Sequence, residues 1–248
     1  MPRKQVKPIY ADTYQRHHRR LVLAGSTALV VAALLVLVVV VMHLQKPPAL
    51  RENPVQGVVL SQDDATQDFS ALKKAGLRFA YLKTTEGASY FDDRFAANYD
   101  QSRGGQLAIG VYHQFSFDST PAAQAQHFIA KVGHDIGTLP IGIALSYYGD
   151  YAEKPPAAAT FQRDLTTFIN LLQAHYNRVV ILMGSVQVLR AVSTVAPSAG
   201  RWVTASAKPA QAQYWQYGSG KIAGQSLTRV AFLGTVANFA NQSNKTVR

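Results

Sequence analysis

Short apolar runs alternate with helix-like segments along most of the chain, beginning near Val55. The runs predict strands at residues 57–60, 79–83, 107–113, 141–145, 179–183, 202–205 and 212–217. Between the strands, apolar residues recur at helical spacing over residues 69–75, 93–103, 120–132, 157–176 and 186–195. Strand-helix units repeated in this order predict an α/β fold with a mostly parallel sheet whose faces are covered.

The length of this region restricts the architecture. Right-handed crossovers allow either a closed barrel or an open doubly wound sheet. The predicted domain, residues 55–240, is short for eight complete units of a typical barrel. Because the later strands follow one another closely, we expect a barrel that lacks some helices near its end.

The apolar run of residues 21–42 precedes this domain and contains no charged residue. At about 1.5 Å per residue, a helix of this length spans roughly 33 Å, the thickness of a bilayer core. No small-x-small cleavage site follows, which favours an uncleaved signal anchor over a cleaved signal peptide. The sequence therefore predicts a single transmembrane helix, a proline-punctuated linker at residues 43–54 and a polar tail at residues 241–248.

The net charge of +11 is concentrated at the amino terminus. Residues 1–50 contain seven Lys or Arg and one Asp, a net +6, which leaves +5 for the rest. The basic tail, residues 1–20, precedes the apolar run, so the positive-inside rule predicts a cytoplasmic amino terminus. We therefore expect a single-pass membrane protein whose domain lies outside the cytoplasm. The tail is expected to contact membrane lipid, and no nucleic-acid partner is expected.

Metal and cofactor chemistry has little support in the sequence. The absence of cysteine excludes disulfides and thiolate metal sites. His113, at a predicted strand end, has no second histidine or carboxylate at ligand spacing, so we predict neither a metal nor a cofactor. We expect His113 to form neutral hydrogen bonds in a pocket.

The segment 79–90 changes character halfway. Its first residues form an apolar strand, whereas residues 84–90 are polar and are expected to form a loop. Loops at the carboxyl ends of strands converge on one face of an α/β sheet, where ligands bind. Glu86 is therefore the first candidate for a functional carboxylate.

Several short motifs occur in a fixed order between residues 57 and 234. They are Lys83-Thr-Thr-Glu86-Gly87, Ser89-Tyr90, Phe95, Asn98-Tyr99, Gly110-Val-Tyr112-His113, Gln124-Ala125, Phe128 and Tyr214-Trp215-Gln216-Tyr217. Together they resemble the glycoside hydrolase family 25 lysozymes, the muramidases that cut peptidoglycan. The resemblance implies an irregular, flattened, TIM-like β/α barrel with its site at the carboxyl ends of the strands.

The chain departs from that family at the acid positions. Val59 matches the aspartate of a first-strand Gly-x-Asp-x-Ser pattern, and Ala144 and Ser146 match an Asp-x-Glu pair after Leu-Pro. A further aspartate is matched by Thr228, or by Arg229 if the register slips by one. Glycoside cleavage requires a proton donor and a group that meets the oxocarbenium-like centre. The resemblance therefore implies a degenerate, inactive site at these positions.

Three other carboxylates lie near predicted strand ends: Glu86, Asp118 and Asp150. Residual catalysis would require Glu86 and Asp150 to act as a displaced pair. Catalytic carboxyl groups lie only about 5 to 9.5 Å apart, and a four-residue displacement along an extended chain exceeds 10 Å. We therefore expect Glu86 to recognise glycan or to pair with Lys83.

Aromatic side chains at predicted strand ends are candidates for sugar binding, because ring faces beside polar groups hold sugar rings. The proposed glycan-binding set is Glu86, Tyr90, Tyr112, His113, Tyr148, Trp215 and Tyr217. Tyr147 and Tyr148 are adjacent on a strand, so one of them should be exposed. Core packing is the alternative for each aromatic residue.

Together with the predicted anchor, the resemblance implies a single-pass protein of the bacterial inner membrane, with its tail in contact with inner-membrane lipid and its domain periplasmic or extracellular. The sequence leaves three functions open. The domain binds peptidoglycan glycan strands without efficient cleavage, it retains residual muramidase activity, or it is a protein-interaction module of an envelope assembly. The +5 charge of the domain is compatible with an anionic polymer such as peptidoglycan.

Overall fold

The structure is a computed structural model that describes residues 11–44, 53–243 and 245–247, with side chains of the first range described only for residues 22–38. The chain divides into two compact units, Met1–Pro48 and Ala49–Arg248. Residues 1–10 of the predicted basic tail and residues 45–52 of the predicted linker lie outside the described residues, and no side chain of the tail is described.

The first unit contains one helix, α1 (Ala11–Leu44). It begins ten residues before the predicted apolar span, which extends past the described side chains at both ends. Among the described residues, no helix has both the length and the apolar character required to cross a membrane.

The second unit is a closed β/α barrel, as predicted. Its parallel strands are β1 (Val55–Leu60), β2 (Phe79–Glu86), β4 (Ala108–Gln114), β5 (Ile141–Leu145), β6 (Val180–Ser185), β7 (Gly200–Thr204) and β8 (Tyr214–Ile222). Strand β9 (Gln225–Phe232) closes the barrel by pairing antiparallel with both β8 and β1. The short strand β3 (Tyr90–Phe91) adds to β2 outside this ring.

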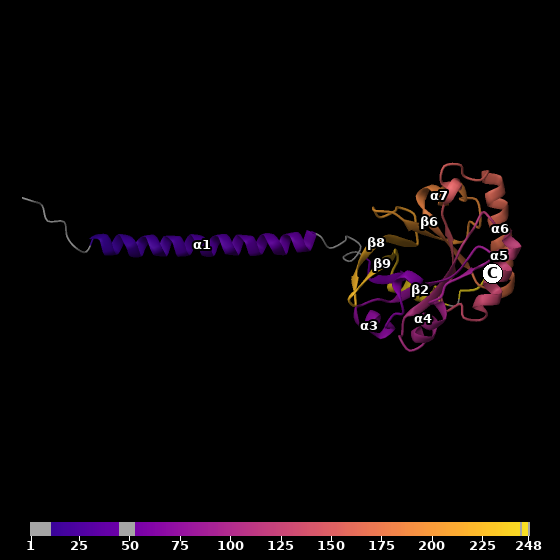
Figure 1. The fold of residues 1–248 in the computed structure, drawn as a ribbon, viewed down its shortest axis with the longest axis horizontal. Coiled ribbons are helices and arrows are strands. Elements are labelled where there is room, and N and C mark those ends of the chain that lie inside the picture. Colours follow the sequence, from indigo (N-terminus) through magenta and orange to yellow (C-terminus); the bar gives the residue numbers. More distant parts are fainter. Residues whose placement is uncertain (1–10, 45–52, 244, 248) are drawn as a thin grey trace, which may run out of the picture. The chain divides into compact units, whose positions relative to one another are not determined.

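Helices surround the first part of the barrel and are missing from the last. Their bounds are α3 (Phe69–Lys74), α4 (Phe95–Ser102), α5 (Pro121–Val132), α6 (Ala158–Tyr176), α7 (Val186–Ala191) and α8 (Val236–Ala240), with 3-10 turns η1 (Gln62–Asp64) and η2 (Gly149–Ala152). Helices α5 and α6 lie side by side along one side of the barrel (Figure 1). No helix joins β7 to β8 or β8 to β9 in this described region, which confirms the expected loss of helices near the end.

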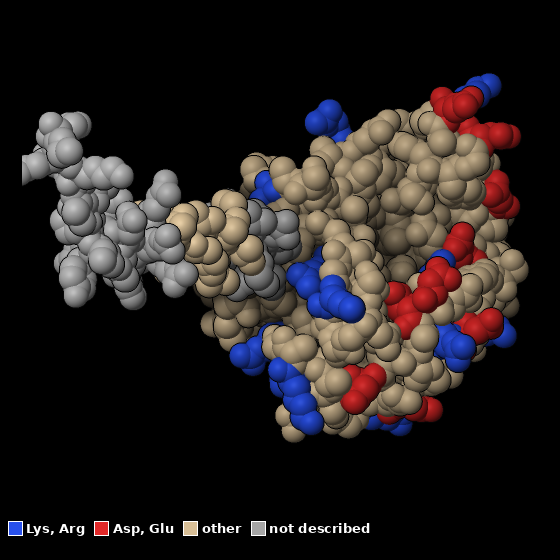
Figure 2. Space-filling model, turned by 60° about the vertical axis from the view of Figure 1, so that its left-hand side comes forward, with Lys and Arg blue, Asp and Glu red and all other residues tan. Residues whose placement is uncertain are grey.

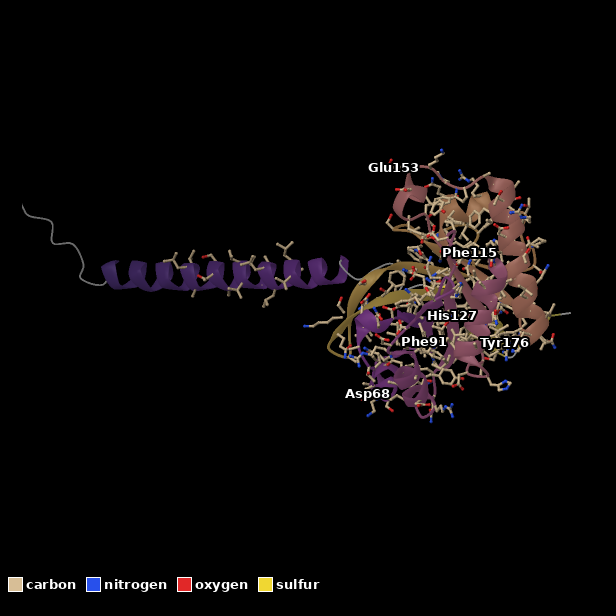
Figure 3. The ribbon with its side chains drawn as sticks, turned by 45° about the vertical axis from the view of Figure 1, so that its right-hand side comes forward. Asp68, Phe91, Phe115, His127, Glu153 and Tyr176 are labelled. Atoms are coloured by element: carbon tan, nitrogen blue, oxygen red, sulfur yellow. The ribbon has the colours of Figure 1, made fainter. Side chains whose placement is uncertain are left out.

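Alternating side chains divide the apolar residues into an interior and an outer layer. The interior holds the aromatic residues Phe79, Tyr81, Trp202 and Tyr214. The outer layer packs the strands against the helices and includes Phe115, which is labelled in Figure 3. The barrel interior is thus a filled core, and the loops at the carboxyl ends of the strands are the expected place for ligand chemistry.

The prediction that residues 84–90 form a loop was wrong in part. Strand β2 continues through Glu86, with an irregularity between Lys83 and Thr85, and then pairs with β3. Thr84 and Thr85 are buried, but both hydroxyl groups have partners. The Thr84 hydroxyl donates to the backbone carbonyl oxygen of Tyr112 at 2.9 Å, and the Thr85 hydroxyl lies 2.8 Å from His113 Nδ1. Hydrogen bonding therefore offsets the cost of burying these polar residues in a strand.

Charged side chains are unevenly distributed over the barrel unit. In the view of Figure 2, most acidic side chains lie along the right-hand side of the barrel unit with some basic ones among them, whereas the middle and the left-hand part carry mainly basic side chains. The positive net charge of the domain is therefore not a uniform property of its surface.

Candidate functional site

The carboxyl ends of the strands form the end of the barrel where this fold places its chemistry. Val59 on β1 and Ala144 on β5 pack against the interior cluster, so both face inward. Thr228 on β9 is the direct pairing partner of Val59 and alternates with the interior residues Val230 and Phe232. Three positions around the centre of this end therefore carry small or apolar side chains.

Ser146 follows β5 at the same end and is exposed. Its hydroxyl accepts a hydrogen bond of 3.0 Å from Gln114 Nε2 at the end of β4. The Thr228 hydroxyl lies 3.5 Å from that of Ser219. Val59, Ala144, Ser146 and Thr228 thus share one end of the barrel, and none of them can ionise near neutral pH to act as a general acid or a nucleophile.

Glu86 lies at the rim of this end and is paired with Lys83. Lys83 Nζ is 2.8 Å from the Glu86 carboxylate and 4.8 Å from the centre of the Tyr90 ring. The Glu86 side chain remains 45% exposed, whereas that of Lys83 is 19% exposed. The expected pairing with Lys83 is confirmed, and both Glu86 and Tyr90 are available to a ligand at the rim.

A pocket of about 370 Å³ opens beside Glu86, and we call it the rim pocket. It is lined by Glu86, Gly87, Ala88, Ser89, Tyr90, Ser116, Asp118 and Ser119. Asp150, the other half of the proposed displaced pair, is exposed in η2 and is not part of this lining. Asp118 is instead the second carboxylate of the pocket.

Asp118 joins the loop after β4 to the loop after β5. Its two carboxylate oxygens accept hydrogen bonds of 2.9 Å from the Tyr148 hydroxyl and 3.0 Å from the Tyr151 hydroxyl. The Tyr148 oxygen also accepts a hydrogen bond from the Phe117 backbone at 2.8 Å, and its ring stacks on that of Phe117. Burial raises the pKa of Tyr148, and the hydrogen bond to Asp118 raises the pKa of Tyr151. Tyr148 is half-buried, so it retains a surface that a ligand can contact.

Two carboxylates near this end were not among the predicted site residues. Asp92 is buried and accepts backbone hydrogen bonds from Gln62 and Arg94, which links the loop after β1 to the start of α4. Asp64 accepts the backbone hydrogen bond of Ser61 and closes the turn η1. Burial raises the pKa of both carboxyl groups. In the sequence, these structural roles are signalled by the pair Asp92-Asp93 before helix α4 and the pair Asp63-Asp64 at the end of η1.

His113 and Tyr112 are adjacent on β4 and face opposite sides of the barrel wall. Tyr112 belongs to the interior cluster, and burial raises its pKa. His113 is 0% exposed and its ring lies 4.7 Å from that of Phe168 on α6. The expectation of a neutral, hydrogen-bonded His113 fits this position, but its place is between strand and helices and not in a pocket.

The protonation of His113 follows from its neighbours. Gln124 Nε2 donates to the Ser116 and Ser119 oxygens, so Gln124 Oε1 accepts the hydrogen bond of 3.0 Å from His113 Nε2. His113 Nδ1 then accepts from the Thr85 hydroxyl at 2.8 Å. Burial lowers the pKa of His113 to about 4, which keeps the ring neutral at physiological pH.

Trp215 and Tyr217 lie on the outside of β8, away from the barrel interior. Trp215 is 3% exposed, and its indole donates a hydrogen bond of 2.8 Å to the Ala205 oxygen. The Tyr217 hydroxyl donates to Gln56 Oε1 at 2.8 Å. The expected position of Trp215 and Tyr217 at the carboxyl end of the barrel was therefore wrong, because Tyr214 and not Trp215 takes the inward position on β8.

The rim around Tyr90 is fixed by α5. His127, labelled in Figure 3, donates a hydrogen bond of 2.9 Å from Nε2 to the backbone carbonyl oxygen of Tyr90. Of the seven proposed glycan ligands, Glu86, Tyr90 and Tyr148 lie together at the rim with accessible surface. The described residues contain no group of three His, Cys, Asp or Glu side chains that could hold a metal ion.

Comparison with known proteins identifies relatives of this barrel. Residues 59–225 match the family described as Glycosyl hydrolases family 25. Lysozyme M1 of Streptomyces globisporus is 36% identical over 129 residues, which cover 49% of this chain and 42% of that protein. The N,O-diacetylmuramidase of Chalaropsis sp. is 36% identical over 83 residues, covering 32% of this chain and 39% of the relative. The matches thus span less than half the length of these two relatives.

Solved structures agree with the sequence match. A family 25 glycosyl hydrolase from Bacillus anthracis superposes with a TM-score of 0.73 at 27% identity, covering 77% of this chain and 94% of the other. The bacterial lysozyme from Streptomyces coelicolor superposes with a TM-score of 0.68 at 25% identity, covering 78% and 98%. The family match, which extends over more than half of the chain, and the shared barrel show that this chain belongs to glycosyl hydrolase family 25.

Proposed function

We propose that this protein is a membrane-anchored member of family 25 that binds peptidoglycan in the bacterial envelope without cleaving it efficiently. The observation that supports the proposal best is the set of side chains at the carboxyl end of the barrel. Val59, Ala144, Ser146 and Thr228 occupy the positions that match the acids of the family, and none is a carboxylate.

The loss of these acids removes the chemistry of glycoside hydrolysis. Cleavage requires an acid that protonates the leaving oxygen and a second group that stabilises the oxocarbenium-like centre. Aliphatic groups at Val59 and Ala144 can do neither, and a serine hydroxyl is too weak an acid at Ser146. The carboxylates that remain at the rim pocket are already engaged: Glu86 with Lys83, and Asp118 with two tyrosines.

The groups that remain at the rim are suited to recognition. Tyr90 and Tyr148 present aromatic surface, and the rim pocket adds hydroxyl and carboxylate acceptors for sugar hydroxyl groups. The names of the relatives, a lysozyme and an N,O-diacetylmuramidase, support peptidoglycan glycan strands as the ligand. Binding of glycan without cleavage is therefore the function that best fits a family 25 barrel without carboxylates at these four positions.

The anchor is part of the same proposal. The uncharged run of residues 21–42 and the basic residues before it support a single-pass protein with a cytoplasmic amino terminus. The barrel then faces the periplasm or the cell exterior, where the peptidoglycan lies. Protease added to spheroplasts should remove the barrel, and protection of the barrel in intact spheroplasts would reverse this topology.

A sedimentation experiment tests the binding. Purified full-length protein in detergent micelles is mixed with purified cell-wall sacculi and centrifuged, and the bound fraction is measured against protein concentration. We expect saturable binding that decreases at least fivefold in a Tyr90→Ala, Tyr148→Ala double variant. Tyr151→Phe, which keeps its ring, is the matched control and should bind nearly normally. Absence of saturable binding would refute the proposal.

Residual hydrolysis is the competing function, because Glu86 and Asp118 both line the rim pocket. It predicts release of reducing ends that Glu86→Gln abolishes. If Glu86 acts with Asp150 instead, Asp150→Asn should also abolish release of reducing ends. A role as a protein-interaction module predicts capture of an envelope protein that soluble glycan does not compete away.

A further inference from the structure

A second cavity lies at the opposite end of the barrel, at the amino-terminal ends of β6, β7 and β8. Its volume is about 640 Å³, within the range of small-ligand sites. The lining comes from the ends of β6, β7 and β9, from the segment before β8 and from α8. Beside the cavity, the backbone carbonyl oxygen of Lys245 accepts a hydrogen bond of 3.3 Å from the Val179 backbone. We call this the basal pocket. It shares no lining residue with the rim pocket.

Side-chain amides dominate the polar lining of the basal pocket. They belong to Gln211, Gln213, Asn238, Asn241 and Gln242. Gln213 Nε2 donates to Gln242 Oε1 at 3.0 Å, which fixes one pair. The side-chain amides of Gln211, Asn238 and Asn241 have no hydrogen-bond partner among the described residues. Each amide offers a donor and an acceptor, so the pocket is suited to a ligand that itself carries amide groups.

The charges of this lining are all positive. Arg201 and Lys245 line the basal pocket, and no carboxylate does. Arg201 donates to the Ala199 oxygen at 2.9 Å and to the Val195 oxygen at 3.1 Å, so its guanidinium is held in place by neutral carbonyl groups. Burial lowers the pKa of Arg201, but a guanidinium stays charged in proteins. Neither cation has an ion-pair partner among the described residues, so an anionic ligand would complement them.

A neighbouring cavity extends the basal pocket. It has a volume of about 510 Å³ and shares Arg201 and Gln211 with the basal pocket. It adds a third cation, Arg190, and an apolar surface from Leu189 and Pro209. This cavity opens where β7 runs into β8 without an intervening helix, so the missing helix leaves the outer face of β7 accessible. The two cavities are thus adjacent through Arg201 and Gln211.

We call the basal pocket and this neighbouring cavity together the basal groove. We propose that the basal groove binds a short anionic peptide with small apolar side chains and free carboxylates. The unpaired amides match peptide groups, the cations match the carboxylates, and Leu189 and Pro209 match methyl-sized side chains. Peptide stems of peptidoglycan have this chemistry. The proposal goes beyond glycan recognition at the rim, because it assigns the peptide part of the polymer to a separate site.

The test uses full-length protein in detergent micelles and a fluorescently labelled stem tetrapeptide, L-Ala-γ-D-Glu-meso-diaminopimelate-D-Ala, without sugar. Fluorescence anisotropy should show saturable binding. Lys245→Glu and the double variant Asn238→Ala, Asn241→Ala should each weaken binding at least fivefold. Asn170→Ala, an exposed amide on α6, is the matched control and should leave binding unchanged. Circular dichroism checks that each variant is folded.

Two competitors separate this site from the rim. Unlabelled tetrapeptide should displace the probe, and peptide-free glycan strands should not. The basal site would be overturned by failure to saturate at millimolar peptide. It would also be overturned if Lys245→Glu and the double amide variant both bound the peptide with wild-type affinity. Neither result bears on binding of peptide-free glycan strands, which tests the rim separately.

Discussion

Val59 on β1 is the direct pairing partner of Thr228 on β9, and both side chains face the barrel interior at the carboxyl end of the strands. Two positions that the sequence resemblance matches to acids of the family are therefore neighbours where β9 closes the barrel. Ala144 faces the same interior from β5. None of these three side chains can ionise near neutral pH.

Restoring the carboxylates should restore cleavage if the frame is intact. We expect the quadruple variant Val59→Asp, Ala144→Asp, Ser146→Glu, Thr228→Asp to release reducing ends from sacculi at a rate at least tenfold above the wild type. The uncharged set Val59→Asn, Ala144→Asn, Ser146→Gln, Thr228→Asn is the matched control, because it has similar shapes without acid chemistry. Equal rates in both folded variants would show that more than the acids has been lost.

His113 should make stability depend on pH. Burial lowers its pKa to about 4, below the value near 6.5 expected in the unfolded chain. The unfolded state therefore binds the proton more readily, and the contribution to stability, present in full above pH 6.5, is lost as pH falls toward 4. The loss is roughly 3 kcal/mol at most by linkage.

Urea unfolding at pH 7.5 and pH 4.5 measures this contribution. His113→Gln should lower stability at pH 7.5 but reduce the difference between the two pH values. His134→Gln, at an exposed histidine, should leave the difference unchanged. An undiminished pH dependence in His113→Gln would assign the effect to other groups.

Asp118 should control the ionisation and position of two rim tyrosines. Its hydrogen bond raises the pKa of Tyr151, whereas burial is the main cause of the raised pKa of Tyr148. We expect Asp118→Asn to lower the pKa of Tyr151 toward its ordinary value and to change Tyr148 less. Spectrophotometric titration near 295 nm, with Tyr151→Phe to assign the signal, measures both. A Tyr151 pKa that is the same in both proteins would contradict the hydrogen bond.

The interior packing predicts a strong effect at Gly110. A side chain there would place its Cβ 2.5 Å from the Tyr81 ring, which lies fully buried and edge-on to Trp202 at 5.0 Å. Gly110→Ala should therefore destabilise the barrel by about 1 to 3 kcal/mol. Gly104→Ala, where nothing lies within 4 Å, should change stability little. Equal urea midpoints for the two variants would show that the interior accommodates the methyl group.

The sequence predicted most strands and helices because these elements have a clear apolar period, but β3, β9 and α8 were not among the predicted elements. It also predicted closure of the barrel and the missing helices, because the last strands are too close for helices between them. It ended β2 too early, since Thr84 and Thr85 look like loop residues until their hydrogen bonds to β4 are known. A local pattern cannot reveal a partner that lies 28 residues away.

The candidate site was harder to predict than the fold. Period-two alternation implies that Tyr214 and Trp215 face opposite sides, but it does not say which of them faces inward. The pairing of β8 with β7 and β9 makes that choice, and the register shift between Gln216 and Gly218 affects the position of Tyr217. Glu86 was placed correctly at a strand end. The expectation that Tyr147 and Tyr148 lie on a strand with one of them exposed was wrong, because β5 ends at Leu145 and both tyrosines are half-buried in the segment that follows. The link through Asp118 depends on two loops meeting in space.

The most direct test of the central claim is reducing-end release by the wild-type protein, measured on sacculi that demonstrably bind it. We predict that the protein sediments with the sacculi while soluble reducing ends stay at the level of buffer at every pH from 4 to 8. An active muramidase added to the same sacculi should release them. Release by the wild type that disappears in Glu86→Gln would contradict the account.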